Sequence, residues 1–154
     1  MNNDNLTLIR TDSENVDFIA LVALLDKDLL DRNGDQQDFY GQFNKLDQIK
    51  NVVLAYIGNI PAGCGAFKQY DTHTLEIKRM FVADAYRGRG VAKAIINELE
   101  TWARELNYNT SVLETSKAQL EAIGLYLKHG FEITENYGQY KGIENSLCMR
   151  KAIG

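Results

Sequence analysis

The chain reads MFVADAYRGRGVAK over residues 80–93, and this stretch decides the fold class. A strand leads into a turn that contains Gly88 and Gly90, and an amphipathic helix begins at Val91. Glycines let the backbone approach a ligand closely, and the unpaired N–H groups of a first helical turn attract phosphate. The stretch therefore predicts an anion site, with a plain strand-to-helix turn as the alternative.

Two familiar phosphate-binding motifs do not fit this spacing. A P-loop requires a glycine, four residues and then Gly-Lys-Ser/Thr, which the stretch lacks. The dinucleotide-binding fingerprint requires a third glycine where the chain has Lys93, together with βαβ units near the N-terminus. Neither class of nucleotide site is expected.

Outward from this stretch, the periodicity of the apolar residues predicts a mixed α/β chain. Strands are expected over residues 6–10, 51–57, 62–68, 75–82, 110–113, 131–134 and 147–151, and helices over residues 16–30, 91–106 and 117–129. Residues 32–46 are expected to form a loop or short helical turns. Strands dominate the first half and alternate with helices in the second. We therefore expect one mixed, mostly antiparallel sheet with flanking helices and a single parallel crossover unit.

Helical spacing also predicts which faces of the helices are buried. The three expected faces are Val16, Ile19, Ala20, Ala23, Leu24 and Leu30 in the first helix, Val91, Ile95, Leu99, Trp102 and Leu106 in the second, and Leu120, Ile123 and Leu127 in the third.

Length and composition exclude several classes of protein. A chain of 154 residues has room for one domain. A net charge of -4 without a basic run argues against binding to nucleic acid or anionic lipid. No apolar stretch approaches the ~20 residues that span a bilayer, and the N-terminus has no basic export signal, so a cytoplasmic protein is expected. Cys64 and Cys148 lie far apart in apolar runs and are expected to be reduced, buried thiols.

One known family combines these features. Arg87, Gly90 and Ala92 match the pattern Arg/Gln-x-x-Gly-x-Gly/Ala, and the flanking segments 76–82 and 122–131 are also similar to those of that family. The chain thus resembles the GCN5-related N-acetyltransferase (GNAT) family. The resemblance implies a single domain over residues 1–154 with the acyl-CoA N-acyltransferase fold. It also implies acetyl-CoA as co-substrate, no metal, and transfer of the acetyl group to a primary amine of a small molecule or peptide.

The resemblance also implies where the co-substrate binds. Backbone amides of the turn would hold the diphosphate of acetyl-CoA, and two strand residues before it would pair with the pantetheine arm. Gln119 stands where many members of the family have Asn, and it shares a helix flank with Tyr126. The residues implied in binding are Phe81, Val82, Arg87, Gly88, Arg89, Gly90, Val91, Ala92, Gln119 and Tyr126.

Transfer to an amine requires two proton transfers. An alkylammonium has a pKa near 10, so a base must take its proton, and an acid should protonate the departing thiolate. By position in the family, Tyr126 is the expected acid and Glu76 the expected base or water holder. The alternative for Tyr126 is a core aromatic residue. The alternatives for Glu76 are an ion pair with Lys78 or a solvated side chain. Glu114, at the end of a predicted strand, is a second candidate for the base.

The acceptor is less well specified by the sequence. Six aspartates against three basic residues between positions 26 and 47 favour a cationic acceptor, or they form a solvated face. Four aromatic residues are expected to wall the acceptor cleft or to cover the core, namely Phe39, Tyr40, Tyr137 and Tyr140. The sequence is also compatible with a homodimer. The alternative to an enzyme is a non-catalytic acyl-CoA-binding regulator that contacts a partner protein.

Overall fold

The computed structural model describes residues 5–33 and 48–154. Its elements, in chain order, are β1 (Leu6–Thr11), α1 (Val16–Asn33), β2 (Asn51–Ile57), β3 (Ile60–Gln69), β4 (Thr74–Val82), the short 3-10 helix η2 (Asp84–Tyr86), α3 (Val91–Glu105), β5 (Thr110–Ser116), α4 (Leu120–Lys128), β6 (Glu132–Thr134), η3 (Gly138–Tyr140) and β7 (Ser146–Ala152). The segment expected over residues 32–46 lies outside the described residues, except that Arg32 and Asn33 continue α1.

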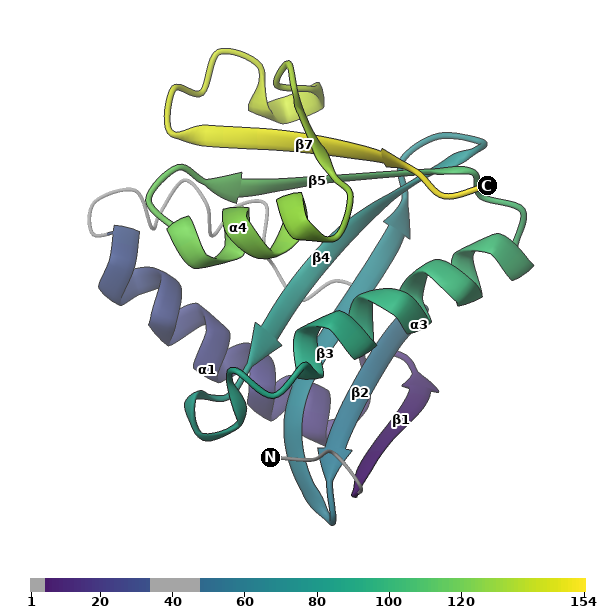
Figure 1. Ribbon diagram of the computed structural model, residues 1–154, viewed down its shortest axis with the longest axis vertical. Coiled ribbons are helices and arrows are strands. Elements are labelled where there is room, and N and C mark those ends of the chain that lie inside the picture. Colours follow the sequence, from purple (N-terminus) through teal and green to yellow (C-terminus); the bar gives the residue numbers. More distant parts are fainter. Residues whose placement is uncertain (1–4, 34–47) are drawn as a thin grey trace.

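The strands form one seven-stranded sheet in the order β1-β2-β3-β4-β5-β7-β6 (Figure 1). Only β4 and β5 are parallel, and α3 connects them; every other pair is antiparallel. The hairpin between β2 and β3 turns through Gly58 and Asn59, with Ile57 opposite Ile60. The predicted mixed, mostly antiparallel sheet with one parallel crossover is confirmed.

The two parallel strands separate soon after they begin. β4 pairs with β5 only from Thr74–Glu76 to Thr110–Val112, whereas β5 pairs with β7 along its whole length. Beyond that point β4 and β5 diverge and open a V in the sheet (Figure 1). A bulge accompanies the divergence: Arg79 has φ 60°, and the β3–β4 register gains one residue on β4 beside it.

α3 packs closely against one face of the sheet because Gly63 and Gly65, both on β3, have no side chain. A Cβ atom at Gly65 would lie 2.8 Å from Ile95 Cγ2 and 3.0 Å from Leu99 Cδ1. Val91, Ile95 and Leu99 are buried there, as predicted, while Leu106 lies beyond the helix and is 48% exposed. The glycine allows the close approach that buries this helix face.

The buried faces predicted for the other two helices are wrong. In α1 the buried residues are Phe18, Leu21, Val22 and Leu25, which pack on the opposite face of the sheet from α3, whereas Val16, Ile19 and Leu24 are exposed. In α4 Leu120 and Leu127 are exposed, and Tyr126 is buried. Both helices carry apolar residues on more than one face. Hydrophobicity alone therefore could not select the side that meets the sheet.

Other expectations concern the thiols and membrane segments. Cys64 and Cys148 are free and buried, as predicted. Among the described helices, none is long and apolar enough to cross a membrane.

Candidate active site

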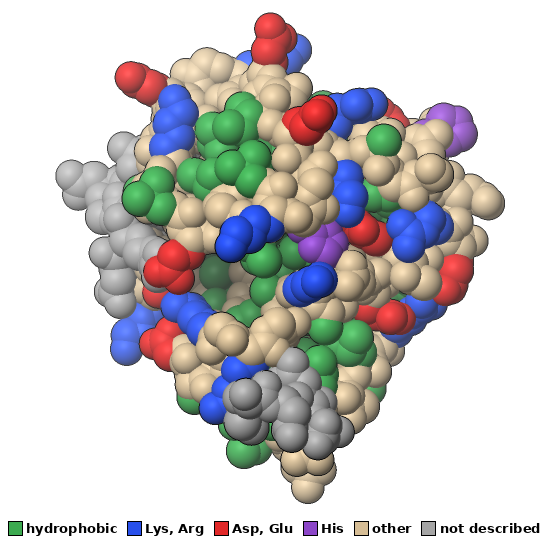
Figure 2. Space-filling model, in the orientation of Figure 1, with side chains coloured by type: hydrophobic (Ala, Val, Ile, Leu, Met, Phe, Trp, Pro, Cys, Tyr) green, Lys and Arg blue, Asp and Glu red, His purple; other side chains and the backbone are tan. Residues whose placement is uncertain are grey.

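The V between β4 and β5 holds a cavity of about 410 Å³. Its walls come from β4, β5, α4, the β4–α3 turn and, across the gap, Leu25, Asp28 and Leu29 of α1. In Figure 2 the surface is hollowed here, with hydrophobic side chains in the depression and charged side chains around it. Segments far apart in the sequence thus meet in one site.

Nearly all the site residues expected from the sequence line this cavity. They are Glu76, Phe81, Val82, Arg87, Gly88, Gly90, Val91, Ala92, Gln119 and Tyr126, together with the rival Glu114. Arg89 does not line it; its guanidinium carbon lies 5.5 Å from the ring centroid of Tyr86. The Arg89 side chain thus lies beside Tyr86, which itself lines the cavity.

The β4–α3 turn presents backbone N–H groups to the cavity. Gly88 and Gly90 have φ of 78° and 79°, left-handed values that favour glycine. The first hydrogen bond of α3 runs from Ala94 N to Gly90 O, so within the described structure no acceptor engages the N–H groups of Val91 and Ala92. The first turn of α3 has no acidic residue. This end of the cavity is therefore suited to an anion.

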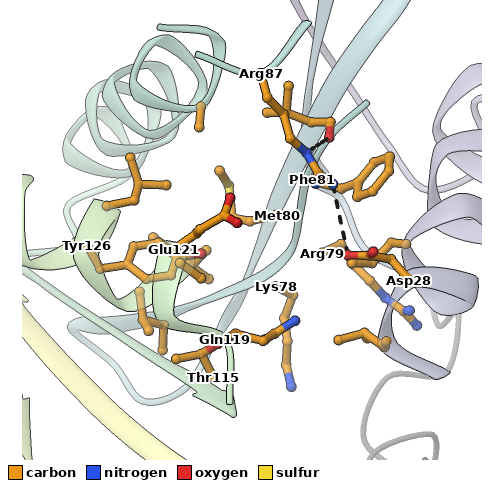
Figure 3. A pocket seen from close by; sticks show the side chains of 18 of the residues that line it. Asp28, Lys78, Arg79, Met80, Phe81, Arg87, Thr115, Gln119, Glu121 and Tyr126 are labelled. Atoms are coloured by element: carbon orange, nitrogen blue, oxygen red, sulfur yellow. Dashed lines mark hydrogen bonds and ion pairs between the residues drawn. The ribbon is translucent and has the colours of Figure 1, made fainter. Parts of the chain in front are cut away.

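Arg87 holds the turn against the end of β4. Its Nε donates to the Val82 carbonyl at 2.8 Å, and its Nη1 lies 2.8 Å from Asp84 Oδ1. Its guanidinium carbon lies 5.6 Å from the ring centroid of Phe81. Figure 3 shows the two side chains beside each other. Arg87 thus fixes the turn and donates a hydrogen bond to a carbonyl at the open edge of β4.

Tyr126 reaches the cavity from α4. The side chain is buried and packs edge-to-face on Phe131, with ring centroids 5.7 Å apart. Burial raises the pKa of its phenol above the usual 10. No residue within 5–33 or 48–154 hydrogen-bonds its hydroxyl. The ring is thus fixed by packing, while the hydroxyl is available to a ligand (Figure 3).

Glu76 is buried on β4 and held by two partners. The hydroxyl of Tyr137 donates to Glu76 Oε2 at 2.7 Å, and Lys78 Nζ lies 3.5 Å from Glu76 Oε1. Lys78 also donates to the hydroxyl of Tyr140 at 3.2 Å. The ion pair between Glu76 and Lys78, which is the alternative to a catalytic role for Glu76, is therefore present. Both residues nevertheless line the cavity.

Glu114 lies across the V from Glu76, on β5. Burial raises its pKa to about 7; Lys78 opposes and Glu76 reinforces that shift through their charges. Its Oε2 is buried without a hydrogen-bond partner among the described residues. A neighbouring hydroxyl, that of Ser146, also lowers the pKa of Glu114, although the two side chains make no well-formed hydrogen bond.

Gln119 precedes the first residue of α4. Its Oε1 accepts a hydrogen bond from the Thr115 hydroxyl at 2.8 Å. The contact ties Gln119 to the end of β5 and leaves its Nε2 donors for a ligand.

The acidic segment expected to attract a cationic acceptor is only partly described. Asp28 lines the cavity, where its Oδ2 lies 3.9 Å from Arg87 Nη2, and Asp26 is paired with Arg79 at 3.3 Å. Positions 35, 38 and 47, and the aromatic positions 39 and 40, lie outside the described residues. In the part of the chain that is described, no group of three or more His, Cys, Asp or Glu side chains could hold a metal.

Sequence reasoning missed the part that Lys78 and the α1 leucines play in the wall. The sequence indicates Lys78 only as an ion-pair partner of Glu76. The signal for its place in the cavity wall is the alternation along β4, which puts positions 76 and 78 on the same face of the strand.

Comparisons with known proteins agree with this geometry. The chain matches the Acetyltransferase (GNAT) family over residues 18–131. It is 37% identical over 101 residues to the uncharacterized N-acetyltransferase YsnE of Bacillus subtilis, an alignment that covers 64% of this chain and 67% of YsnE. It is 40% identical over 63 residues to N-acetyltransferase 8B of Rattus norvegicus. That match covers 41% of this chain and only 28% of the relative's length.

Solved structures show the same fold. A protein of Klebsiella pneumoniae, provisionally named an acyl-CoA N-acyltransferase, superposes with a TM-score of 0.80 at 24% identity, covering 97% of this chain and 98% of the other. A GNAT family acetyltransferase from Elizabethkingia anophelis with acetyl-CoA bound gives a TM-score of 0.68 at 19% identity, covering 97% and 99%. The predicted fold, enzyme class and co-substrate, acetyl-CoA, are confirmed at the level of the family. The chain belongs to the Acetyltransferase (GNAT) family.

Proposed function

We propose that residues 1–154 form a single N-acetyltransferase domain that moves the acetyl group of acetyl-CoA to a primary amine of a small molecule or peptide. One observation carries the proposal. A single cavity joins a helix N-terminus, the open edge of β4, a buried phenol and two carboxylates. Those groups are the ones that binding a diphosphate thioester and moving two protons require.

We propose that the diphosphate binds at the β4–α3 turn. The N–H groups of Val91 and Ala92 and the positive end of the α3 dipole favour it. The pantetheine arm then runs beside Phe81 and Val82, because β5 has left this edge of β4. The Val82 carbonyl already accepts from Arg87, and its second lone pair remains for a donor of the pantetheine arm. Gln119 Nε2 is a further donor to the arm.

Tyr126 is assigned as the acid. As the thioester breaks, negative charge develops on the CoA sulfur, and a buried phenol that no described residue hydrogen-bonds is available to protonate it. Burial raises the pKa of Tyr126, so the proton stays on the phenol until that charge develops. The ring packing on Phe131 holds the hydroxyl in place.

Glu76 is assigned as the base, or as the group that orders a water between itself and the amine. Its carboxylate is held by Tyr137 and Lys78 at the bottom of the V. A specific observation favours Glu114 as the second candidate: its pKa of about 7 lies near neutral pH, where a general base is most effective. Substitution of each carboxylate in turn shows which of the two is the base.

The test follows thiol release from acetyl-CoA with a panel of amines, amino acids and peptides. Acetyl-CoA binding is measured in parallel by calorimetry. Release with any amine supports the enzyme. Binding without release favours a non-catalytic acyl-CoA-binding regulator. Single-turnover rates of Glu76→Gln and Glu114→Gln then identify the base, which is the carboxylate whose loss slows the chemical step more.

A further inference from the structure

Lys78 is a cation in the part of the cavity wall where Glu76 and Glu114 also lie. It projects from β4 into the cavity (Figure 3), and its side chain is 11% exposed. Its Nζ lies 3.5 Å from Glu76 Oε1 and 3.2 Å from the Tyr140 hydroxyl, with the ring centroid of Tyr140 5.8 Å away. The site therefore offers charges of both signs within a few ångströms.

This arrangement is unfavourable for an acceptor that is only a cation. A fixed ammonium beside the carboxylates repels a second ammonium and reduces the attraction that Glu76 and Glu114 would give it. The contact between Lys78 and Glu76 at 3.5 Å is also longer than the roughly 2.7–2.9 Å of a strong charge-assisted hydrogen bond. A substrate carboxylate next to Lys78 would offset this repulsion and restore the attraction for an amine.

An α-amino acid carries both charges at a matching spacing. Its ammonium nitrogen and carboxyl carbon are separated by two bonds of about 1.5 Å each. We propose that the acceptor is an α-amino acid whose carboxylate binds Lys78 while its amine faces Glu76 and Glu114. Leu25 and Leu29 in the α1 wall favour an apolar side chain on that amino acid. The inference rests on the proposed function and specifies its acceptor.

The test compares amino acids with their amides, which differ only in the carboxylate. The twenty common amino acids are screened first, and leucine is expected among the best. The parent should prefer the amino acid over its amide by roughly 10- to 100-fold in kcat/KM, calculated per free amine, as expected for a hydrogen bond to a charged group. Lys78→Gln should remove most of that preference, and Lys78→Arg should keep much of it. Lys141→Gln, which changes an exposed lysine next to Tyr140, is the matched control and should retain the preference.

The ratio separates recognition of the substrate from an effect on Glu76. If Lys78→Gln slows the amino acid and its amide by the same factor, Lys78 acts on Glu76 and the proposal is wrong. A parent that uses no amino acid better than its amide overturns it as well.

A binding measurement keeps this result distinct from the proposed function. The thermal midpoint of the CoA-bound parent should rise more with leucine than with leucinamide, and Lys78→Gln should abolish the difference. That difference without turnover of any amine would support recognition by Lys78 while rejecting the acetyltransferase. Turnover of other amines with no such difference for any amino acid would reject recognition by Lys78 alone.

Discussion

Replacing Glu114 by Gln should stabilise the protein at alkaline pH and much less at acid pH. Burial raises the pKa of Glu114 from its usual 4.5 to about 7, so ionising this carboxyl costs the folded state more than the unfolded chain. Between these two values the folded state binds a proton that the unfolded chain has lost, and stability falls as the pH rises through this window. At 1.36 kcal/mol per pKa unit, the cost is about 3 kcal/mol at pH 8 and about 1 kcal/mol at pH 5.

The assay is reversible denaturant unfolding of parent and variant at both pH values. The free energy of unfolding gained by Glu114→Gln should be about 2 kcal/mol larger at pH 8 than at pH 5. The difference between the two proteins cancels the titration of groups that they share. Glu132→Gln, on the exposed strand β6, is the control and should show no such pH dependence. An equal gain in the free energy of unfolding at the two pH values would refute a Glu114 carboxyl whose pKa burial raises to about 7.

The other predictions concern ligand and catalysis. Gly90→Ala should weaken acetyl-CoA binding in calorimetry at least tenfold by disturbing the turn; Gly142→Ala has the same φ of 79° outside the cavity and should leave affinity unchanged, and equal affinity of the two variants would argue against the diphosphate assignment. Tyr126→Phe should slow single-turnover acetylation roughly 10²-fold with little change in acetyl-CoA affinity, and less with a thioester whose thiol is more acidic; an undiminished rate would leave Tyr126 only a packing role. Glu76→Gln should lower turnover roughly 10²-fold near neutral pH and recover in part at higher pH, where more amine is free; parental rates at every pH would transfer the role of base to Glu114.

Much of the fold could be predicted from local patterns. The apolar run over residues 52–57 predicted β2 with its observed end at Ile57, where the chain turns through Gly58 and Asn59, two residues that tolerate a hairpin turn. The stripe Val91, Ile95 and Leu99 identified the buried face of α3. These signals are local: each depends on residues a few positions apart, which the sequence shows directly.

The family could be identified from the signature in the β4–α3 turn, because its residues Arg87, Gly90 and Ala92 lie within a few positions of one another. Which face of α1 is buried was decided only in the tertiary structure, since Leu24 and Leu25 are equally apolar and the position of the sheet selects Leu25. The chemistry of the two carboxylates was decided there too. Glu76 accepts a hydrogen bond from Tyr137, 61 residues away, and burial removes solvent from Glu114. Desolvation and long-range hydrogen bonds depend on the three-dimensional surroundings of a group, which residue spacing does not contain.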